Sequence, residues 1–169
     1  MRSARPFLLL FLALVSLAPA CLFAQTAGSK PADPSPVAIP AGYYSVAAPV
    51  AILYDSPSAW GKKLYLVKEG TPLEVVQPIM GWAKVRDAEG LPEGLVWIEN
   101  DKLSPRRTVI VIADLADVRQ SASDTAPIAF QAEKWLILDL LSNSPPGWAK
   151  VRHPDGSGGF VRLGQVWGL

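Results

Sequence analysis

The sequence is poor in the side chains that most often carry catalysis or bind metal ions. Its 169 residues include one cysteine, Cys21, and one histidine, His153. A lone cysteine cannot form an intramolecular disulfide, and a lone histidine needs acidic neighbours to hold a metal ion. His153 lies in a His-Pro-Asp-Gly turn, where a solvated position is the ordinary explanation. We therefore expect no enzyme activity, no metal site and no cofactor.

An excess or clustering of charge of one sign is also missing. The chain has 16 Lys and Arg against 15 Asp and Glu, a formal charge of +1. Nucleic-acid binding draws most of its non-specific affinity from clustered basic side chains, and the sequence contains no such cluster. Carboxylate pairs of the glycosidase kind, such as Asp55 with Glu69 or Asp114 with Asp117, lie in turns, and nothing in the sequence makes them converge. We expect neither nucleic-acid binding nor glycoside hydrolysis.

The amino terminus has the pattern of a secretory signal peptide. Arg2 and Arg5 precede an apolar run over residues 7–15, and small residues lead to an Ala24-Gln25 step. A membrane-spanning helix is the competing interpretation, but Pro19 interrupts the run, and about 20 apolar residues are normally needed to cross a bilayer. We predict cleavage of residues 1–24 and export to the periplasm or cell surface, with no transmembrane helix in the mature chain.

Cys21 allows a second interpretation of the same segment. Residues 17–21 can be read as a lipoprotein cleavage box, which would leave Cys21 as a lipidated first residue. Such boxes prefer leucine three residues before the cysteine and a small residue two before it. Here those positions hold Ala18 and Pro19, a poor match. Lipidation and removal of Cys21 both stay open.

Residues 25–42 contain four prolines among small and polar residues and follow neither a helical nor a strand period. Such a stretch buries too little apolar surface to offset the loss of chain entropy, and its prolines keep it extended. We interpret residues 25–42 as a Pro-rich tether.

An internal duplication organises the rest of the chain. The hexamer GWAKVR at residues 81–86 recurs unchanged at residues 147–152. Residues 51–56 and 73–76 match residues 116–121 and 138–141, both at a spacing of 65, and residues 97–98 match residues 160–161 at a spacing of 63. Since insertions collect in loops, this small drift is expected between two copies of one unit. We place the copies at residues 43–104 and 108–168.

Both units have the pattern of an all-β fold. Short runs rich in β-branched residues are interrupted at regular intervals by Gly, Pro, Asp and Ser, as in small sandwiches and barrels. After the signal region no segment keeps an apolar period of 3.6 over three turns. We expect almost no helix and two tandem small β-barrels of five to six antiparallel strands each.

The two units resemble the bacterial SH3 family. Its repeats typically carry a Leu-Asn-Val-Arg-like strand, then a Gly-Trp-x-Lys-Val-like strand, then a closing Gly-Trp-Val-like strand. Residues 116–119, 147–151 and 159–161 show that order in the second unit, and residues 52–54, 81–85 and 96–98 show it in the first. The resemblance implies two tandem SH3-like barrels.

The departures from the family pattern concern the surface on which a ligand would bind. Family members often have Gly-Pro-Ser after Val-Arg and an aromatic residue after Gly-Trp, whereas this chain has residues 121–123 (SAS) and Ala149. The first unit also has Tyr54 where arginine is usual. What the resemblance implies is a non-catalytic module, often attached to cell-wall enzymes and credited with binding peptidoglycan or its peptides.

Strand alternation divides the repeated hexamer into two faces. Ala83 and Val85 are expected to point into the barrel, which leaves Trp82, Lys84 and Arg86 together on the outside. A hairpin that pairs Arg86 near Leu95 would place Trp97 opposite Lys84. We predict that such aromatic and cationic side chains bind a sugar or a carboxylate-bearing peptide, and the candidate ligand-binding residues are Trp60, Trp82, Lys84, Trp97, Trp148, Lys150 and Phe160.

For the two hexamer tryptophans, a structural role is the preferred interpretation, and ligand contact is the alternative. A 60-residue barrel has little interior, so Trp82 and Trp148 could cover its edge while Lys and Arg stems pack alongside. Two functional hypotheses follow. The chain is either a cell-envelope module that binds peptidoglycan or a wall peptide, or an adaptor that binds an envelope protein through a groove or an edge strand.

Overall fold

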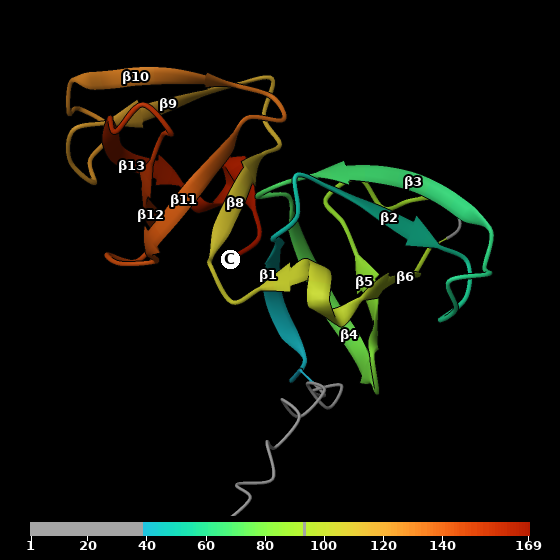
Figure 1. Cartoon of the computed structure of the whole chain (residues 1–169). Helices are drawn as coiled ribbons and strands as arrows, with labels where there is room; N and C mark the ends of the chain where they lie inside the picture. Colours follow the sequence, from blue (N-terminus) through green and yellow to red (C-terminus); the bar gives the residue numbers. More distant parts are fainter. Residues whose placement is uncertain (1–38, 93) are drawn as a thin grey trace, which may run out of the picture. The chain divides into compact units, whose positions relative to one another are not determined.

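The computed structural model describes residues 39–92 and 94–169. The predicted signal peptide, Cys21 and most of the predicted tether lie outside the described residues. The described part consists of β-strands and two single-turn 3₁₀ helices, so the expected all-β class is confirmed (Figure 1). In this part of the chain, no helix has the length and apolar character needed to span a membrane.

The first repeat forms one antiparallel sheet whose strands lie in the order β3-β2-β6-β5-β4-β1-β7. Its elements are β1 (Gly42–Val46), β2 (Val50–Tyr54), β3 (Lys63–Lys68), β4 (Pro72–Ile79), β5 (Trp82–Arg86), β6 (Val96–Glu99), η1 (Asn100–Lys102) and β7 (Leu103–Ser104).

The second repeat forms a sheet in the equivalent order, β10-β9-β13-β12-β11-β8-β14. Its elements are β8 (Thr108–Val111), β9 (Leu115–Arg119), β10 (Ile128–Glu133), β11 (Ile137–Ser142), β12 (Trp148–Arg152), β13 (Gly158–Arg162), η2 (Leu163–Gln165) and β14 (Val166–Trp167). Each element of one repeat therefore has a counterpart in the other, as the duplicated sequence predicted.

The two copies of the hexamer occupy equivalent strands. Lys84 on β5 lies opposite Trp97 on β6, and Lys150 on β12 lies opposite Phe160 on β13. The predicted pairing of Lys84 with Trp97 is thus confirmed. The shared register places corresponding side chains of the two repeats at the same point of the fold, so the repeats can be compared residue by residue.

Each sheet differs from the expectation in strand number and closure. Seven strands are present in each sheet instead of five or six, because β7 and β14 are two-residue strands that return after a 3₁₀ turn. A two-residue strand is too short to show an alternating sequence pattern, so these strands could not be predicted. Within the described residues the edge strands β3 and β7 do not pair, nor do β10 and β14, so the SH3-like sheets curl without closing into complete barrels.

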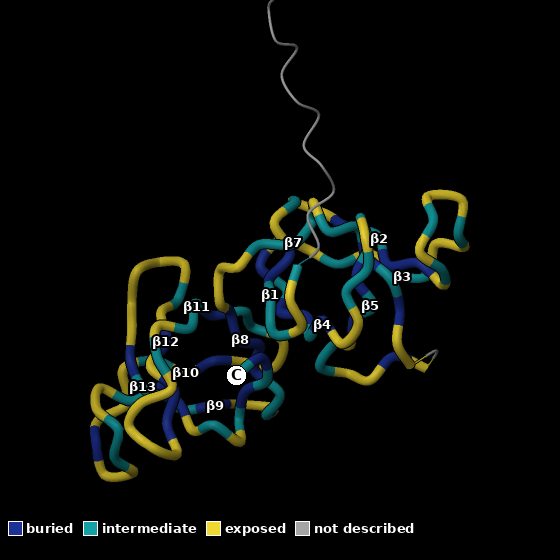
Figure 2. The backbone as a smooth tube through the Cα atoms, turned by 90° about the horizontal axis from the view of Figure 1, so that it is seen from below, coloured by how far each residue is buried: buried dark blue, intermediate teal, exposed yellow. Residues whose placement is uncertain are grey.

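Strand alternation sets the two hydrophobic cores. Ala83 and Val85 are fully buried on β5, as are Ala149 and Val151 on β12, which confirms the inward face predicted for the hexamer. Leu73 and its counterpart Leu138 are also fully buried. Burial of a leucine side chain contributes roughly 1.5–3 kcal/mol. Figure 2 shows the same division, with buried segments in the strands and exposed ones mainly in the turns.

Direct contacts join the two repeats. The Thr108 hydroxyl donates a hydrogen bond of 2.7 Å to the carbonyl of Gly70, and the Thr108 side chain is almost completely buried. Tyr43 and Trp167 meet edge to face with ring centroids 5.3 Å apart. The guanidinium of Arg107 lies 5.5 Å from the centre of the Tyr43 ring. Because a unit of this size buries little apolar surface alone, these contacts add buried surface that neither unit has by itself.

Candidate functional site

The outer face of repeat 1 carries an unusual number of apolar side chains. We use this name for the side of β2, β3, β5 and β6 that points away from the core, and it includes Val50, Ile52, Tyr54, Leu66, Trp82, Lys84 and Trp97. The strand pairing makes these residues neighbours, because Ile52 lies opposite Leu66 and Tyr54 lies opposite Trp97. The result is an apolar and aromatic surface across four strands.

Three aromatic rings and one cation form the centre of this face. Tyr54 meets Trp82 edge to face, with ring centroids 5.4 Å apart and planes at 85°. The Lys84 ammonium lies 5.6 Å from the centre of the Trp97 ring. Tyr54 is buried, whereas Trp82, Lys84 and Trp97 are each partly exposed. A ligand can therefore reach two indole rings and an ammonium group, and one of the two rings, Trp82, packs against the buried Tyr54.

The aliphatic part of the face is open to solvent. Leu66 is 72% exposed and Val50 is 57% exposed. Single exposed apolar residues are normal, but contiguous apolar surface on a soluble protein marks a site of interaction. Val50, Ile52, Tyr54 and Leu66 were not among the predicted ligand-binding residues. The signal was present in the alternation of residues 50, 52 and 54, which places three apolar side chains on the side away from the core.

Trp60 lies in the loop between β2 and β3 and is 97% exposed. Its backbone amide donates a hydrogen bond to the hydroxyl of Ser58. Asp55 holds the base of the loop, since its carboxylate accepts hydrogen bonds from the Ser56 hydroxyl and the Lys62 amide. The loop is therefore ordered from within and presents the Trp60 ring to solvent.

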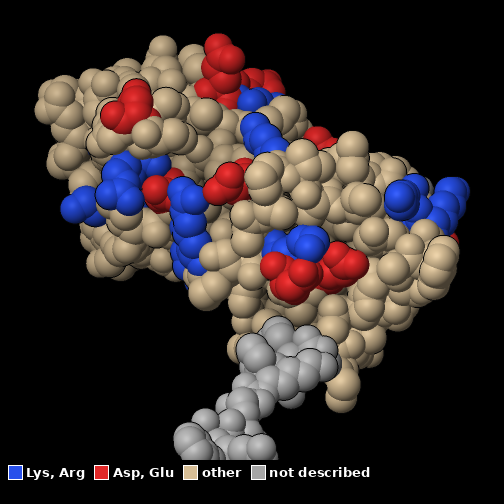
Figure 3. Space-filling model, in the orientation of Figure 1, with Lys and Arg blue, Asp and Glu red and all other residues tan. Residues whose placement is uncertain are grey.

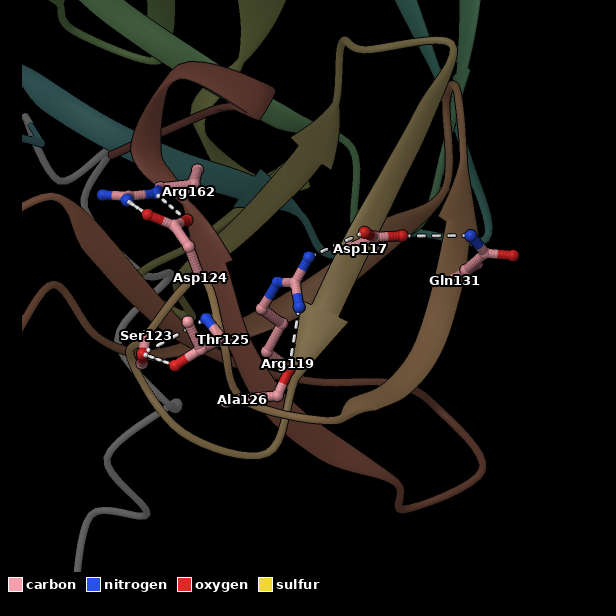
Figure 4. Close-up of polar contacts among 8 residues, drawn as sticks. All are labelled: Asp117, Arg119, Ser123, Asp124, Thr125, Ala126, Gln131 and Arg162. Atoms are coloured by element: carbon pink, nitrogen blue, oxygen red, sulfur yellow. Dashed lines mark hydrogen bonds and ion pairs between the residues drawn. The ribbon is translucent and has the colours of Figure 1, made fainter.

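The equivalent face of repeat 2 carries a hydrogen-bonded polar network at three of the matching positions. Asp117, Arg119 and Gln131 occupy the positions of Ile52, Tyr54 and Leu66. The Asp117 carboxylate accepts hydrogen bonds of 3.0 Å from both Arg119 and Gln131, as Figure 4 shows. Arg119 also donates to the carbonyl of Ala126 at 2.8 Å, so the network ties the strands to the following loop.

Trp148, the counterpart of Trp82, is enclosed. It points away from the core, as alternation requires, but it is only 5% exposed. The guanidinium of Arg162 lies 4.2 Å from the centre of the Trp148 ring. Asp124, from the loop between β9 and β10, holds Arg162 through an ion pair and a hydrogen bond to Nε of 3.1 Å (Figure 4). The ring is therefore covered, which agrees with the structural role, and ligand binding by Trp148 stays a prediction.

Repeat 1 has no equivalent of this cover among its described residues. Glu99 stands where repeat 2 has Arg162, and Ala59 stands where it has Asp124. Glu99 instead forms an ion pair of 3.7 Å with Lys102. At these positions repeat 1 thus has neither the cation nor the carboxylate that would hold it. Trp82 therefore stays partly exposed, whereas Trp148 is enclosed.

Lys150 and Phe160 remain accessible on repeat 2. Lys150 is exposed, Phe160 is partly exposed, and the ammonium lies 5.9 Å from the ring centre. The pair repeats the contact of Lys84 with Trp97 at the matching register, with a smaller ring. Their role in ligand binding stays a prediction.

The groups weighed for catalysis are engaged in local contacts. Asp114 pairs with Lys134 at 3.3 Å, and His153 lies 3.0 Å from Asp155 within its own turn. Hydrogen bonds from Ser157 lower the pKa of Asp155 from 3.8 to about 2. In the described residues no three His, Cys, Asp or Glu side chains are grouped as metal ligands. On the face drawn in Figure 3, acidic and basic side chains lie close together.

Comparison with solved structures finds distant similarity. NlpC2 and NlpC1 from Trichomonas vaginalis match at 14% identity and a TM-score of 0.34, over 76% and 75% of this chain and 48% and 45% of theirs. An NlpC/P60 family protein from Bacillus cereus matches at 14% identity and a TM-score of 0.34, over 75% of this chain and 56% of its own. The chain thus spans about half the length of these proteins. A search of curated proteins found no match.

The model of the family described as "Bacterial SH3 domain" matches this sequence twice, over residues 47–105 and 113–168. Both matches fall on the duplicated units, and together they cover most of the described chain. The chain therefore belongs to the bacterial SH3 domain family, of which it carries two tandem copies.

Proposed function

We propose that this chain is a non-enzymatic binding module of the cell envelope that recognises peptidoglycan, or a peptide attached to it, through the outer face of repeat 1. The observation that carries the proposal is the contrast between the two repeats. At matching positions, repeat 1 presents Ile52, Tyr54 and Leu66, and repeat 2 presents the bonded network of Asp117, Arg119 and Gln131.

The chemistry of the face suits a ligand with both apolar and polar surface. Partly exposed indole rings supply a large contact area with little loss of side-chain entropy, and they stack on sugar rings or on peptide side chains. Lys84 adds a cation beside Trp97, where it can pair with the carboxylate of a peptide or an acidic sugar. Membership of the bacterial SH3 family supports a binding role, and the predicted signal peptide would deliver the chain to the cell envelope.

Sedimentation with purified, protein-free cell-wall sacculi tests the proposal. The mature wild-type chain is expected to sediment, and Trp97→Ala is expected to reduce the bound fraction at least tenfold. The matched control is Phe160→Ala, because Phe160 lies at the same register position in repeat 2. Circular dichroism should report the same β content for both variants. Equal binding by both variants would contradict the assignment to repeat 1.

A second pair of variants tests the aliphatic part of the face. Leu66→Gln installs in repeat 1 the residue that repeat 2 carries at Gln131, and Leu66 is exposed enough to leave the core untouched. Binding should fall, whereas Gln131→Leu, the reverse change in repeat 2, should leave it unchanged. A wild-type protein that fails to sediment would remove the wall-binding proposal.

The adaptor function is the second candidate, and β3 favours it. This strand is the edge of its sheet, pairs only with β2 among the described strands, and exposes Leu66. An extended segment of an envelope protein could add to such an edge through backbone hydrogen bonds. Lys63 and Lys68 at its two ends would favour an acidic segment. Cross-linking in the envelope, with failure to bind sacculi, would support this function over the first.

A further inference from the structure

Trp135 adopts a backbone conformation that tryptophan rarely takes. Its φ is +70°, and it is the one non-glycine residue with positive φ in the described part of the chain. The left-handed region brings the Cβ of an L-residue against its own backbone, so a bulky side chain there is a true outlier. Trp135 is also 39% exposed, so core packing does not account for it. Strain of this kind collects at binding sites.

The first repeat shows what this turn requires of the backbone. Gly70 occupies the equivalent position with φ of +78°. The amide of Gly70 donates to the carbonyl of Val46 at 2.8 Å, and the amide of Trp135 donates to the carbonyl of Val111 at 2.9 Å. The two turns therefore share one conformation, which glycine adopts without strain. In repeat 2 a tryptophan stands where the fold favours glycine.

The Trp135 ring lines a cavity between the two repeats. Its volume is about 200 Å³, and its lining includes Pro72 and Ile110 as apolar walls and Lys68, Asp87 and Glu89 as charged groups. Thr108 and Gly70, whose hydrogen bond joins the two repeats, are each two positions from a lining residue, Ile110 and Pro72. Binding pockets for drug-sized ligands measure roughly 300–1,000 Å³, so this cavity suits a single ring-sized group.

The charges around the cavity indicate which class of ligand fits. Lys68 lines the cavity, so a cationic ligand would meet a like charge there, whereas the Lys134 ammonium, 5.3 Å from the centre of the Trp135 ring, is paired with Asp114. Asp87 and Glu89 would repel an anion. A neutral ligand with one apolar face and several hydroxyl groups fits these surroundings. Its apolar face can pack on the indole, and its hydroxyl groups can form hydrogen bonds with the two carboxylates and with the lysine.

We propose that the cavity beside Trp135 is a carbohydrate site for one pyranose residue, separate from the outer face of repeat 1. The sugar ring stacks on the indole. Its hydroxyl groups donate to Asp87 and Glu89 and accept from Lys68. The strained conformation of Trp135 is retained because glycine at this position would remove the stacking surface.

Nuclear magnetic resonance with the full mature chain and N-acetylglucosamine, glucose or chitobiose as probes tests the site. At least one sugar is expected to shift the indole N–H signal of Trp135 saturably at millimolar concentration. Trp135→Gly should abolish the binding, which the amide signals of Thr71 and Ala88 report in the absence of the ring. Trp97→Ala, which alters the outer face of repeat 1, should leave the response unchanged and so separates the two proposals.

Thermal unfolding of the same variants provides an independent readout. Because glycine relieves the left-handed strain, Trp135→Gly should unfold at the wild-type temperature or above it. If the ring were structural, its removal would instead lower the melting temperature markedly. Glu89→Ala, at an exposed position, should weaken sugar binding with the fold intact. No saturable shift with any of the three sugars, or the same response in Trp135→Gly, would overturn the proposal.

Discussion

Replacing Thr108 by valine isolates the contribution of one hydrogen bond between the repeats. Thr108 is 2% exposed, and its hydroxyl donates to the carbonyl of Gly70 at 2.7 Å. Valine has nearly the same shape, so Thr108→Val opens no large cavity and removes only the donor. The carbonyl then loses this bond in a buried place, which costs about 1–3 kcal/mol.

The expected change in melting temperature follows from the size of the folded part. Unfolding entropy is about 2.1 cal/mol/K per residue, which for roughly 130 folded residues makes 1 kcal/mol equivalent to about 4 °C. Thr108→Val should therefore lower the melting temperature by roughly 4–11 °C. Differential scanning calorimetry of the mature chain measures this change directly.

A surface threonine provides the matched control. Thr125 lies in an exposed turn, and its hydroxyl shares a hydrogen bond of 3.0 Å with Ser123. Water can replace that bond, so Thr125→Val should change the free energy of unfolding by no more than about 0.5 kcal/mol. If Thr108→Val cost no more than this control, the hydrogen bond between the repeats would contribute nothing measurable and the reasoning would be refuted.

Three further changes test the cores and the turns. Leu73→Ala removes a fully buried side chain and should cost about 2–5 kcal/mol in chemical unfolding, and a smaller loss would mean that the core of repeat 1 is loosely packed. Gly159→Ala should cost roughly 1–3 kcal/mol, because the new Cβ would lie 2.5 Å from a carbonyl oxygen of β9, whereas Gly164→Ala, with nothing within 4 Å, should be close to neutral. The Asp155 carboxyl should titrate by nuclear magnetic resonance near its lowered pKa of about 2, and Ser157→Ala should move that pKa back toward 3.8. Since the pKa is lowered in the folded state, the stabilisation from Asp155 is present above pH 3.8 and is lost as the pH falls through about 2. If Ser157→Ala left the titration midpoint of Asp155 unchanged, the serine would not be the cause of the lowered pKa.

The inward and outward faces of the hexamer strand, its pairing with the next strand and the similarity of the two units could be predicted from the sequence, because they depend on local periods and on duplication. Alternation in the hexamer placed Ala83 and Val85 in the core, and the assumed hairpin from the hexamer strand to the next strand placed Trp97 opposite Lys84. These relations involve residues close together in the chain, where geometry leaves few choices. The same alternation marked which side of each strand faces away from the core.

What covers that outer side was decided only by the tertiary structure. Trp82 and Trp148 lie in identical hexamers, yet one is partly exposed and the other is enclosed by Arg162 and Asp124. Arg162 and Asp124 are 38 positions apart, and no local period brings them together. Exposure depends on which loop folds over a ring and which charges meet there, so the open face had to be read from the folded chain.

The backbone conformation of Trp135 and the hydrogen bond of Thr108 between the repeats are also features that only the tertiary structure decided. Nothing in the sequence next to Trp135 indicates a positive φ, because tryptophan is among the residues least suited to it, and the conformation is seen only in the folded chain. The duplicated sequence by itself determined two similar sheets, each with its core. The tertiary structure decided where they touch and which surfaces stay open, because these depend on contacts between segments distant in sequence.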